Sequence, residues 1–251
     1  MKKLVAFLLV IVAVIFTGNL FNTPEVAQVI TTPTASPTNN IQSVTLDVEG
    51  ISMRINWVEV DPTKVELYSN LTNKQTSAQI IHERNCKTLV NGGFYSKENK
   101  HLGLLIDTNG LVSHAQENSL FNGFLWFDLQ GVYITTSPPD NAHLAVQTGP
   151  VIINDSKPRM LSIKNDEQAR RVVAAITTEN KLLFLVIYRD GSEFQGPYLE
   201  ELPKIIQEFS NSSDLEIVNA INLDGGNASA FITDFVNLTE RTQIGSYFCV
   251  E

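Results

Sequence analysis

One carboxylate lies where an apolar run meets two glycines. The segment 221–229 reads Ile-Asn-Leu-Asp-Gly-Gly-Asn-Ala-Ser, so Asp224 ends a strand-like stretch and Gly225 and Gly226 follow it. Glycine tolerates positive φ and lets a ligand approach the backbone, which suits a reactive carboxylate that faces a polar substrate. An isolated Asp-Gly-Gly also fits a β-turn in which the carboxylate caps the following backbone, so the interpretation depends on other segments.

Two other strand ends carry groups suited to a sugar. Asn91 could hydrogen-bond to sugar hydroxyls, and Gly92 and Gly93 after it could admit the ring, although a hairpin corner explains the same residues. Thr148 and Gly149 could add a hydroxyl and a backbone N–H, although the Gly-Pro step that they lead into is also an ordinary turn.

Two adjacent arginines, Arg170 and Arg171, precede an apolar strand. A planar guanidinium suits phosphate because it donates two parallel hydrogen bonds. Neighbouring strand residues point to opposite faces, so we expect one arginine in the site and the other on the solvated surface. We assign Arg171 to the site, and the reverse assignment stays open.

Two further residues belong to the Asp224 segment. Asn222 shares a face with Asp224 and could orient its carboxylate, and Ser229 supplies a hydroxyl at the end of the loop.

The composition limits the class of protein. The 251 residues are 43% hydrophobic and 18% charged, so the chain can bury a full core. The net charge of −9, the pI near 5.0 and the absence of a basic cluster argue against a nucleic-acid or anionic-membrane surface. The four histidines are scattered without ligand spacing, so we expect no metal and no organic cofactor; His101 is the least improbable ligand.

The first 22 residues have the pattern of a targeting segment. Lys2 and Lys3 precede an apolar run over 4–17, which fits a secretory signal. A membrane-spanning helix needs roughly 20 apolar residues, and the run approaches that only if it continues to Phe21. As a cleaved signal peptide or as an N-terminal membrane anchor, residues 1–22 export the domain, and they are its only expected contact with a membrane.

A linker and one folded domain are expected after this segment. Residues 23–42 are rich in Thr, Pro, Ser and Asn, which predicts an extended linker, and the domain then covers 43–251. Alternating and apolar runs predict strands at 44–48, 53–60, 65–68, 88–91, 103–107, 111–113, 124–128, 132–134, 145–147, 151–153, 172–177, 182–188, 218–223, 230–232 and 247–250. Hairpins are expected over 44–60, 103–113 and 124–134, and 172–177 is expected to pair with 182–188.

Only residues 198–209 have a clear helical stripe, and 76–83 is a short helix or a loop. Many strands, hairpin links and few helices predict an α+β fold, a single domain with a largely antiparallel mixed β-sheet core that the last two strands, 230–232 and 247–250, close. Cys86 and Cys249 could form a disulfide if their strands meet, and two buried free thiols are the alternative.

Four segments taken together resemble the ordered motifs of the phosphodiester glycosidase family. They are Val90-Asn91-Gly92-Gly93-Phe94-Tyr95, Gln147-Thr148-Gly149-Pro150, Arg170-Arg171 before a strand, and Asn222-Leu223-Asp224-Gly225-Gly226. The resemblance covers about 88–250, and the order of the motifs is more specific than any one of them. Two departures affect the expected substrate: Asn227 and Ala228 replace small residues of the family's glycine loop, and the strand after Arg171 lacks the family's glycine.

The resemblance implies an exported glycosidase that hydrolyses a sugar-1-phosphodiester, so the expected partner is a carbohydrate or sugar-phosphodiester substrate. Asp224 would be the nucleophile or the base for water, and Arg171 would hold the phosphate. A catalytically silent carbohydrate-binding domain tethered at the cell surface is the alternative. An ordinary glycoside hydrolase would need a second acid, for which Asp107 or Glu83 is available without a spacing that selects either.

Overall fold

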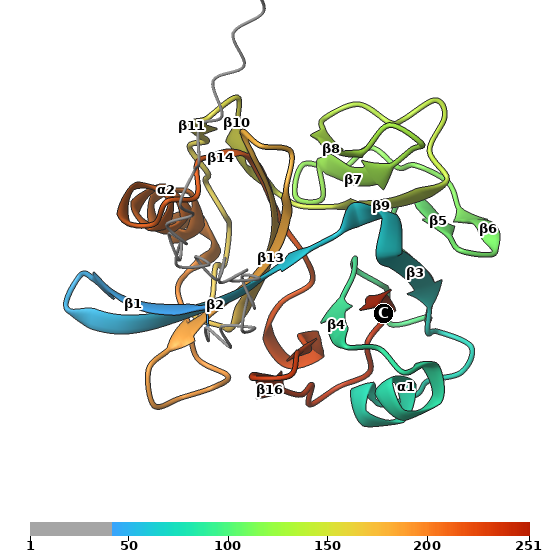
Figure 1. The fold of residues 1–251 in the computed structure, drawn as a ribbon, viewed down its shortest axis with the longest axis horizontal. Coiled ribbons are helices and arrows are strands. Elements are labelled where there is room, and N and C mark those ends of the chain that lie inside the picture. The colour runs from blue at the N-terminus through green and yellow to red at the C-terminus, as the bar shows by residue number, and fades with distance from the viewer. Residues whose placement is uncertain (1–41) are drawn as a thin grey trace, which may run out of the picture. The chain divides into compact units, whose positions relative to one another are not determined.

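The structure is a computed structural model that describes residues 42–251, in which the strands form three sheets (Figure 1). Every strand pair within this range is antiparallel. The α+β prediction with a largely antiparallel sheet core is confirmed, with the strands divided among three sheets. The predicted targeting segment 1–22 and all but the last residue of the predicted linker lie outside the described residues.

The first sheet has seven strands in the order β1-β2-β13-β12-β14-β10-β11. Their bounds are Ser43–Val48 for β1, Ile51–Val60 for β2, Val151–Asn154 for β10, Lys157–Pro158 for β11, Arg171–Thr177 for β12, Leu182–Arg189 for β13 and Ile217–Asn222 for β14. The predicted hairpin of β1 and β2 turns at Glu49 and Gly50, which both have positive φ. The predicted pairing of β12 with β13 is confirmed as well.

Both faces of strand β12 are covered. Val172 and Ala174 pack into the main core with residues of the other two sheets, and Val173 and Ala175 pack on the opposite face with helix α2. Helix α2 (Leu202–Ser212) follows a 3₁₀ turn at Leu199–Glu201. The predicted apolar stripe of 198–209 therefore buries itself against the seven-stranded sheet (Figure 1).

The second sheet has five strands in the order β16-β15-β4-β17-β3. Their bounds are Val65–Ser69 for β3, Thr88–Asn91 for β4, Phe231–Ile232 for β15, Asn237–Leu238 for β16 and Ser246–Val250 for β17. The last two predicted strands, β15 and β17, do not pair with each other or close the first sheet; they flank β4. The reason is that β4 is buried along its whole length and offers both of its edges to the end of the chain.

A disulfide joins Cys86, just before β4, to Cys249 in β17, with the Cα atoms 5.3 Å apart. Pairing of Thr88 with Val250 brings the two cysteines together, so the predicted alternatives are resolved in favour of the disulfide.

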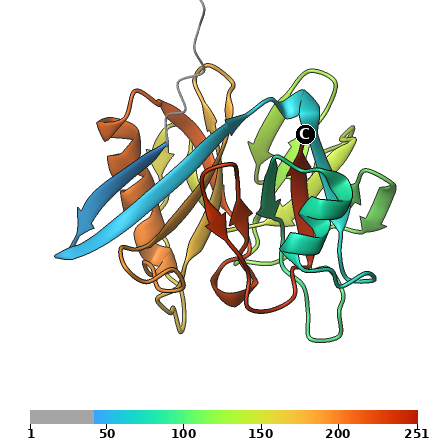
Figure 2. The same ribbon diagram turned by 60° about the horizontal axis from the view of Figure 1, so that its bottom comes forward.

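Strand β2 leads from the first sheet through a 3₁₀ turn at Pro62–Lys64 into β3, and Figure 2 shows its long path across the front of the molecule.

The third sheet has the order β6-β5-β9-β7-β8. Its strands are β5 (Leu105–Asp107), β6 (Gly110–Ser113), β7 (Gly123–Phe127), β8 (Val132–Thr135) and β9 (Leu144–Thr148). Both predicted hairpins, β5 with β6 and β7 with β8, are present. After β9 the chain crosses through Gly149 and a cis Pro150 into β10 of the first sheet. The motif Gln-Thr-Gly-Pro therefore lies where two sheets meet.

The sequence predicts a short helix or a loop over 76–83, and the structure has helix α1 (Ser77–Arg84) there. Thr76 and Gln79 form a reciprocal capping box at its start, which satisfies two backbone donors. No helix within the described range has the length and apolarity needed to cross a membrane.

Candidate functional site

Asp224 lies at a corner between two sheets. Strand β14 ends at Asn222, the N–H of Leu223 donates to the carbonyl of Val172 in β12 (2.8 Å), and the N–H of Asp224 donates to the carbonyl of Gly92 after β4 (2.9 Å). Two backbone hydrogen bonds on successive residues therefore pass the chain from the first sheet to the second. The carboxylate is delivered where the ends of β4, β12 and β14 meet.

Asn91 holds this corner together. It is fully buried; its Nδ2 donates to the carbonyl of Asp224, and its Oδ1 accepts from the N–H of Ala230 (2.9 Å). The side chain thus fixes both ends of the 224–230 loop, and sugar binding by Asn91 stays a prediction.

Gly92 and Gly93 allow neighbouring chains to approach each other. A Cβ at Gly92 would lie 2.4 Å from Oγ of Ser246, and one at Gly93 would lie 2.6 Å from Cγ2 of Val146. The N–H of Gly93 donates to the same Ser246 hydroxyl (3.0 Å). In this structure the glycines make room for β17 and β9, and the prediction that they admit a sugar ring is untested.

Arg170 lies beneath the glycine loop. Its Nε donates to Oγ of Ser229 (2.7 Å), and its Nη2 donates to the carbonyls of Ser229 (2.5 Å) and Thr239 (2.6 Å). Ser229 Oγ donates in turn to the carbonyl of Gly226 (2.6 Å), whose N–H donates to the carbonyl of Arg170 (2.8 Å). These contacts form a closed ring that fixes the backbone after Asp224.

The expectation that one of the two arginines is a solvated surface residue is wrong. Arg170 is fully buried, and Arg171 is half-buried. The physical reason is that β12 has covered faces on both sides, so side chains on opposite faces both enter the protein.

Arg171 lies beside the loop. A Cβ at Gly225 would lie 3.8 Å from its Nη1, while its Nε donates to the carbonyl of Pro197 (3.1 Å) and its Nη2 to Oδ1 of Asp166 (3.2 Å) and the carbonyl of Glu167. Burial lowers the pKa of Arg171, and the Asp166 carboxylate opposes that change. Within residues 42–251, Nη1 of Arg171 donates no hydrogen bond.

The end of β9 joins the same corner. Thr148 Oγ1 donates to the carbonyl of Asn222 (2.9 Å), and Asn222 Nδ2 donates to the carbonyl of Gly149 (2.8 Å). Both side chains are buried, and Asn222 Oδ1 has no hydrogen-bond partner in the described part of the chain. Residues of all four motifs are thus linked around segment 222–229, the third motif through Arg170. Arg171 hydrogen-bonds instead to Pro197, Asp166 and Glu167, away from Asp224.

The electrostatics of the corner favour a proton on Asp224. Burial raises the pKa of its carboxyl to about 7, and the backbone N–H of Gly225 offsets only part of that change. At neutral pH the group therefore exists as a mixture of acid and carboxylate. Burial, and after it the charge of Asp224, raises the pKa of Tyr95, whose hydroxyl donates to the carbonyl of Gln243 (2.6 Å).

Tyr95 and Ser246 are the corner residues that the sequence did not reveal. Tyr95 directly continues the Asn-Gly-Gly-Phe run, so its place in that motif is the signal that could have found it. Ser246 has no local signal, because the pairing of β17 with β4 alone brings it to Gly92. In residues 42–251 no group of three or more His, Cys, Asp or Glu side chains is arranged to hold a metal ion.

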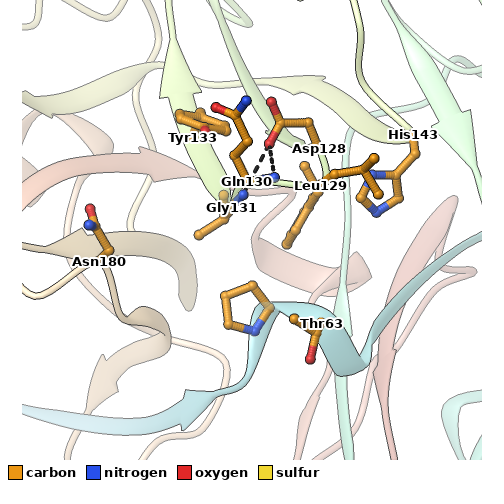
Figure 3. Close-up of a pocket in the computed structure, with 11 residues that line it drawn as sticks. Thr63, Asp128, Leu129, Gln130, Gly131, Tyr133, His143 and Asn180 are labelled. Atoms are coloured by element: carbon orange, nitrogen blue, oxygen red, sulfur yellow. Dashed lines mark hydrogen bonds between the residues drawn. The ribbon is translucent and has the colours of Figure 1, made fainter.

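A pocket of about 510 Å³ lies at the other ends of the strands that form the corner (Figure 3). Phe127, which ends β7, and Asn180, which follows β12, line it, whereas the corner is next to Gly123 and Arg171 at the starts of those strands. None of the predicted site residues lines this pocket.

Comparison with known proteins agrees with the four motifs. A model of the phosphodiester glycosidase family matches residues 84–250, more than half of the chain. The catalytic domain of zebrafish N-acetylglucosamine-1-phosphodiester alpha-N-acetylglucosaminidase, auto-inhibited by its pro-peptide, is similar with a TM-score of 0.62 and 14% identity, over 84% of this chain and 82% of that one.

Two other solved structures share the fold. A hypothetical protein from Synechocystis has a TM-score of 0.56 and 13% identity, over 83% of this chain and 61% of its own. A Burkholderia pseudomallei protein described as exported has a TM-score of 0.55 and 11% identity, over 80% and 74%. No curated protein sequence matches. The match over 84–250 shows that this chain belongs to the phosphodiester glycosidase family.

Proposed function

We propose that the protein hydrolyses the bond between the anomeric carbon of a sugar and a phosphodiester, with Asp224 as the catalytic carboxylate. Family membership supports the reaction class. The observation that carries the assignment is the position of Asp224, held by Gly92, Asn91 and the Arg170 ring at a corner where the residue is half-buried and desolvation raises its pKa to about 7.

The chemistry needs only one such group. A phosphodiester is a weak base when it leaves, so the bond to the sugar breaks with little help from a general acid. A carboxyl group with a pKa near neutrality is well matched to take a proton from water, and its anionic form stabilises the positive charge that grows on the sugar ring. Asp224 then acts as the base for water, or as a nucleophile if it attacks the anomeric carbon directly.

Arg171 is the proposed phosphate contact. Its Nη1 faces the Gly225 side of the loop, whereas its Nη2 is held by Asp166 and Glu167. A cation fixed on one side and free on the other can bind an anion with little loss of side-chain entropy. We assign Asn91, Asn222 and Arg170 to positioning, because their side chains hold the backbone on which the carboxylate stands.

The proposed location is outside the cytoplasm. The Cys86–Cys249 disulfide supports it, because disulfides persist in oxidising compartments and are rare in the cytosol. The expected signal or anchor over 1–22 would deliver the domain there.

The test measures free sugar released from the methyl phosphodiesters of glucose 1-phosphate and N-acetylglucosamine 1-phosphate. We expect Asp224→Asn to lower kcat/KM about 100- to 10,000-fold, the usual contribution of a positioned acid or base. Asp128→Asn is the matched control: the same substitution in the pocket of Figure 3, expected to change the rate less than about twofold. Binding of both phosphodiesters without turnover by the unaltered protein would instead establish the carbohydrate-binding alternative, which the Asn227-Ala228 departure favours.

A further inference from the structure

A serine and a histidine outside the Asp224 corner form a close pair. Oγ of Ser69 and Nε2 of His101 are 2.7 Å apart. Both residues line a second pocket of about 740 Å³, bounded by the loops that follow β3 and β6. A hydroxyl within hydrogen-bond distance of an imidazole nitrogen at the wall of a pocket is the arrangement of a nucleophile and its base, with the tautomer that leaves Nε2 unprotonated accepting from the hydroxyl.

Ser69 is held on a rigid element. It ends β3, pairs with Ser246 of β17, and donates its backbone N–H to Oδ2 of Asp107 (3.2 Å). The next residue, Asn70, is fully buried, and its amide bonds the carbonyls of Gln75 (2.9 Å) and Ile244 (3.0 Å). The loop beyond the serine is therefore fixed, and the hydroxyl keeps its place beside His101.

His101 is fixed by a short hairpin. The N–H of Leu102 donates to the carbonyl of Phe94 (3.0 Å), and the N–H of Ser96 donates to the carbonyl of Lys100 (2.8 Å). Burial lowers the pKa of His101 to about 4, and the charge of Asp107 opposes that change. The imidazole is therefore unprotonated at neutral pH, which leaves one ring nitrogen free to accept a hydrogen bond, and the 2.7 Å distance to Ser69 Oγ places that nitrogen against the hydroxyl.

This pair is separate from the proposed sugar site. Ser69 in β3 and the end of β4 are separated by β17, so about 10 Å of sheet lies between them at the usual strand spacing. The charge on Asp224 does not contribute to the pKa of His101, whereas that of Asp107 does. The reaction proposed for Asp224 leaves Ser69 and His101 unused.

We propose that Ser69 and His101 form a nucleophile and base that hydrolyse carboxylic esters of small acyl groups in the 740 Å³ pocket. Ser69 Oγ attacks the ester carbonyl carbon, and its proton passes to His101 Nε2. The C–O bond to the alcohol breaks, and His101 gives the proton to the leaving alkoxide. Water then attacks the acyl-serine with His101 as base, which releases the acid and restores the hydroxyl.

The open pocket suits a polar alcohol. Lys100 and Glu98 line it together with the pair, and the ammonium group of Lys100 can offset the negative charge of the tetrahedral intermediate. An acetylated sugar has this chemistry: a small acyl group on a polyhydroxyl alcohol.

The experiment follows hydrolysis of p-nitrophenyl acetate by the protein and locates the acetyl group by mass spectrometry after a rapid acid quench. We expect acetyl on the peptide that contains Ser69. Ser69→Ala should lower the rate at least about 100-fold, and His101→Gln should give a loss of similar size, because removal of a positioned base typically costs that much.

Ser96→Ala is the matched control, because Ser96 lines the same pocket and its hydroxyl contacts the N–H of Glu98 rather than His101. This variant should keep the wild-type rate within about twofold. Thermal unfolding of each variant verifies that the fold is intact. An unchanged rate in a folded Ser69→Ala variant, or acetyl found only on other residues, overturns the proposal. The sugar-phosphodiester assay is independent, so either proposal can fail alone.

Discussion

The Asp224 corner and the pocket of Figure 3 lie at opposite ends of β7 and β12, and they differ in how their carboxylates are placed. Asp224 is held by backbone contacts from two sheets, and burial raises its pKa. Asp128 accepts from the N–H groups of Gln130 (2.7 Å) and Gly131 (3.0 Å) within its own turn, beside a fully exposed Leu129 (Figure 3).

The comparison separates two properties: the volume of a pocket and the shift of a carboxyl pKa. The 128–131 turn lines the pocket, and the N–H groups of that turn satisfy the Asp128 carboxylate. The corner holds a carboxyl group whose charged form is destabilised, and perturbed pKa values of this kind are common at acid–base sites. Burial at a junction of sheets, rather than cavity size, selects the candidate catalytic group.

The pH dependence of stability is the largest expected effect. A free Asp carboxyl has a pKa of about 3.9, so the raised pKa of Asp224 makes the folded protein bind the proton more tightly than the unfolded chain. The stabilisation from Asp224 is full below about pH 4 and is lost as the pH rises through about 7. A difference of about three pKa units corresponds to up to about 4 kcal/mol.

Urea unfolding of the wild type and of Asp224→Asn at about pH 4 and pH 8 measures this effect. Because Asn does not titrate, the variant should gain stability relative to the wild type as the pH rises. An equal change of unfolding free energy in both proteins would show that the Asp224 carboxyl is not desolvated, and the contrast with Asp128 would disappear.

A pair of glycine substitutions tests the packing contrast. At Gly149, with φ of +149°, an added Cβ would lie 2.7 Å from the carbonyl oxygen of Leu120 and 2.9 Å from the backbone nitrogen of Asn122. We expect Gly149→Ala to cost about 3 kcal/mol. Gly131→Ala at the pocket, where the nearest atom is 3.9 Å away, should cost less than about 0.5 kcal/mol. Similar urea midpoints for both variants would contradict the contrast.

Arg171→Ala is expected to give the smallest change, and it tests whether Arg171 contacts the phosphate of the substrate. Loss of the Nη1 contact should lower kcat/KM for sugar phosphodiesters about tenfold, consistent with one charge-assisted hydrogen bond, and should leave neutral aryl glycosides nearly unaffected. The two substrate types serve as controls for each other. An equal loss on both would assign Arg171 to holding the segment of Asp166 and Pro197 rather than to the phosphate.

Elements that depend on local sequence patterns were predicted, whereas pairing between distant strands was not. Alternation and turn residues are local, so the hairpins β1–β2, β5–β6 and β12–β13 were predicted from short stretches. The sequence did not distinguish helix α1 from a loop because the apolar face of the helix is small. Its packing depends on contacts with residues far away in the sequence, which an eight-residue segment does not reveal. The partners of β15 and β17 were wrong because strand pairing over long sequence separations has no local code.

The sequence by itself determined which groups exist at the strand ends: an acid before two glycines, an amide before two more, and paired arginines before an apolar strand. Only the tertiary structure decided their relations. It buried Arg170 fully and Arg171 in part because β12 has covered faces, joined Cys86 to Cys249 through β4 and β17, and placed the side-chain amide of Asn91 against the backbone carbonyl of Asp224. Residue types are local properties of the chain, whereas desolvation and hydrogen-bond partners depend on which distant strands meet.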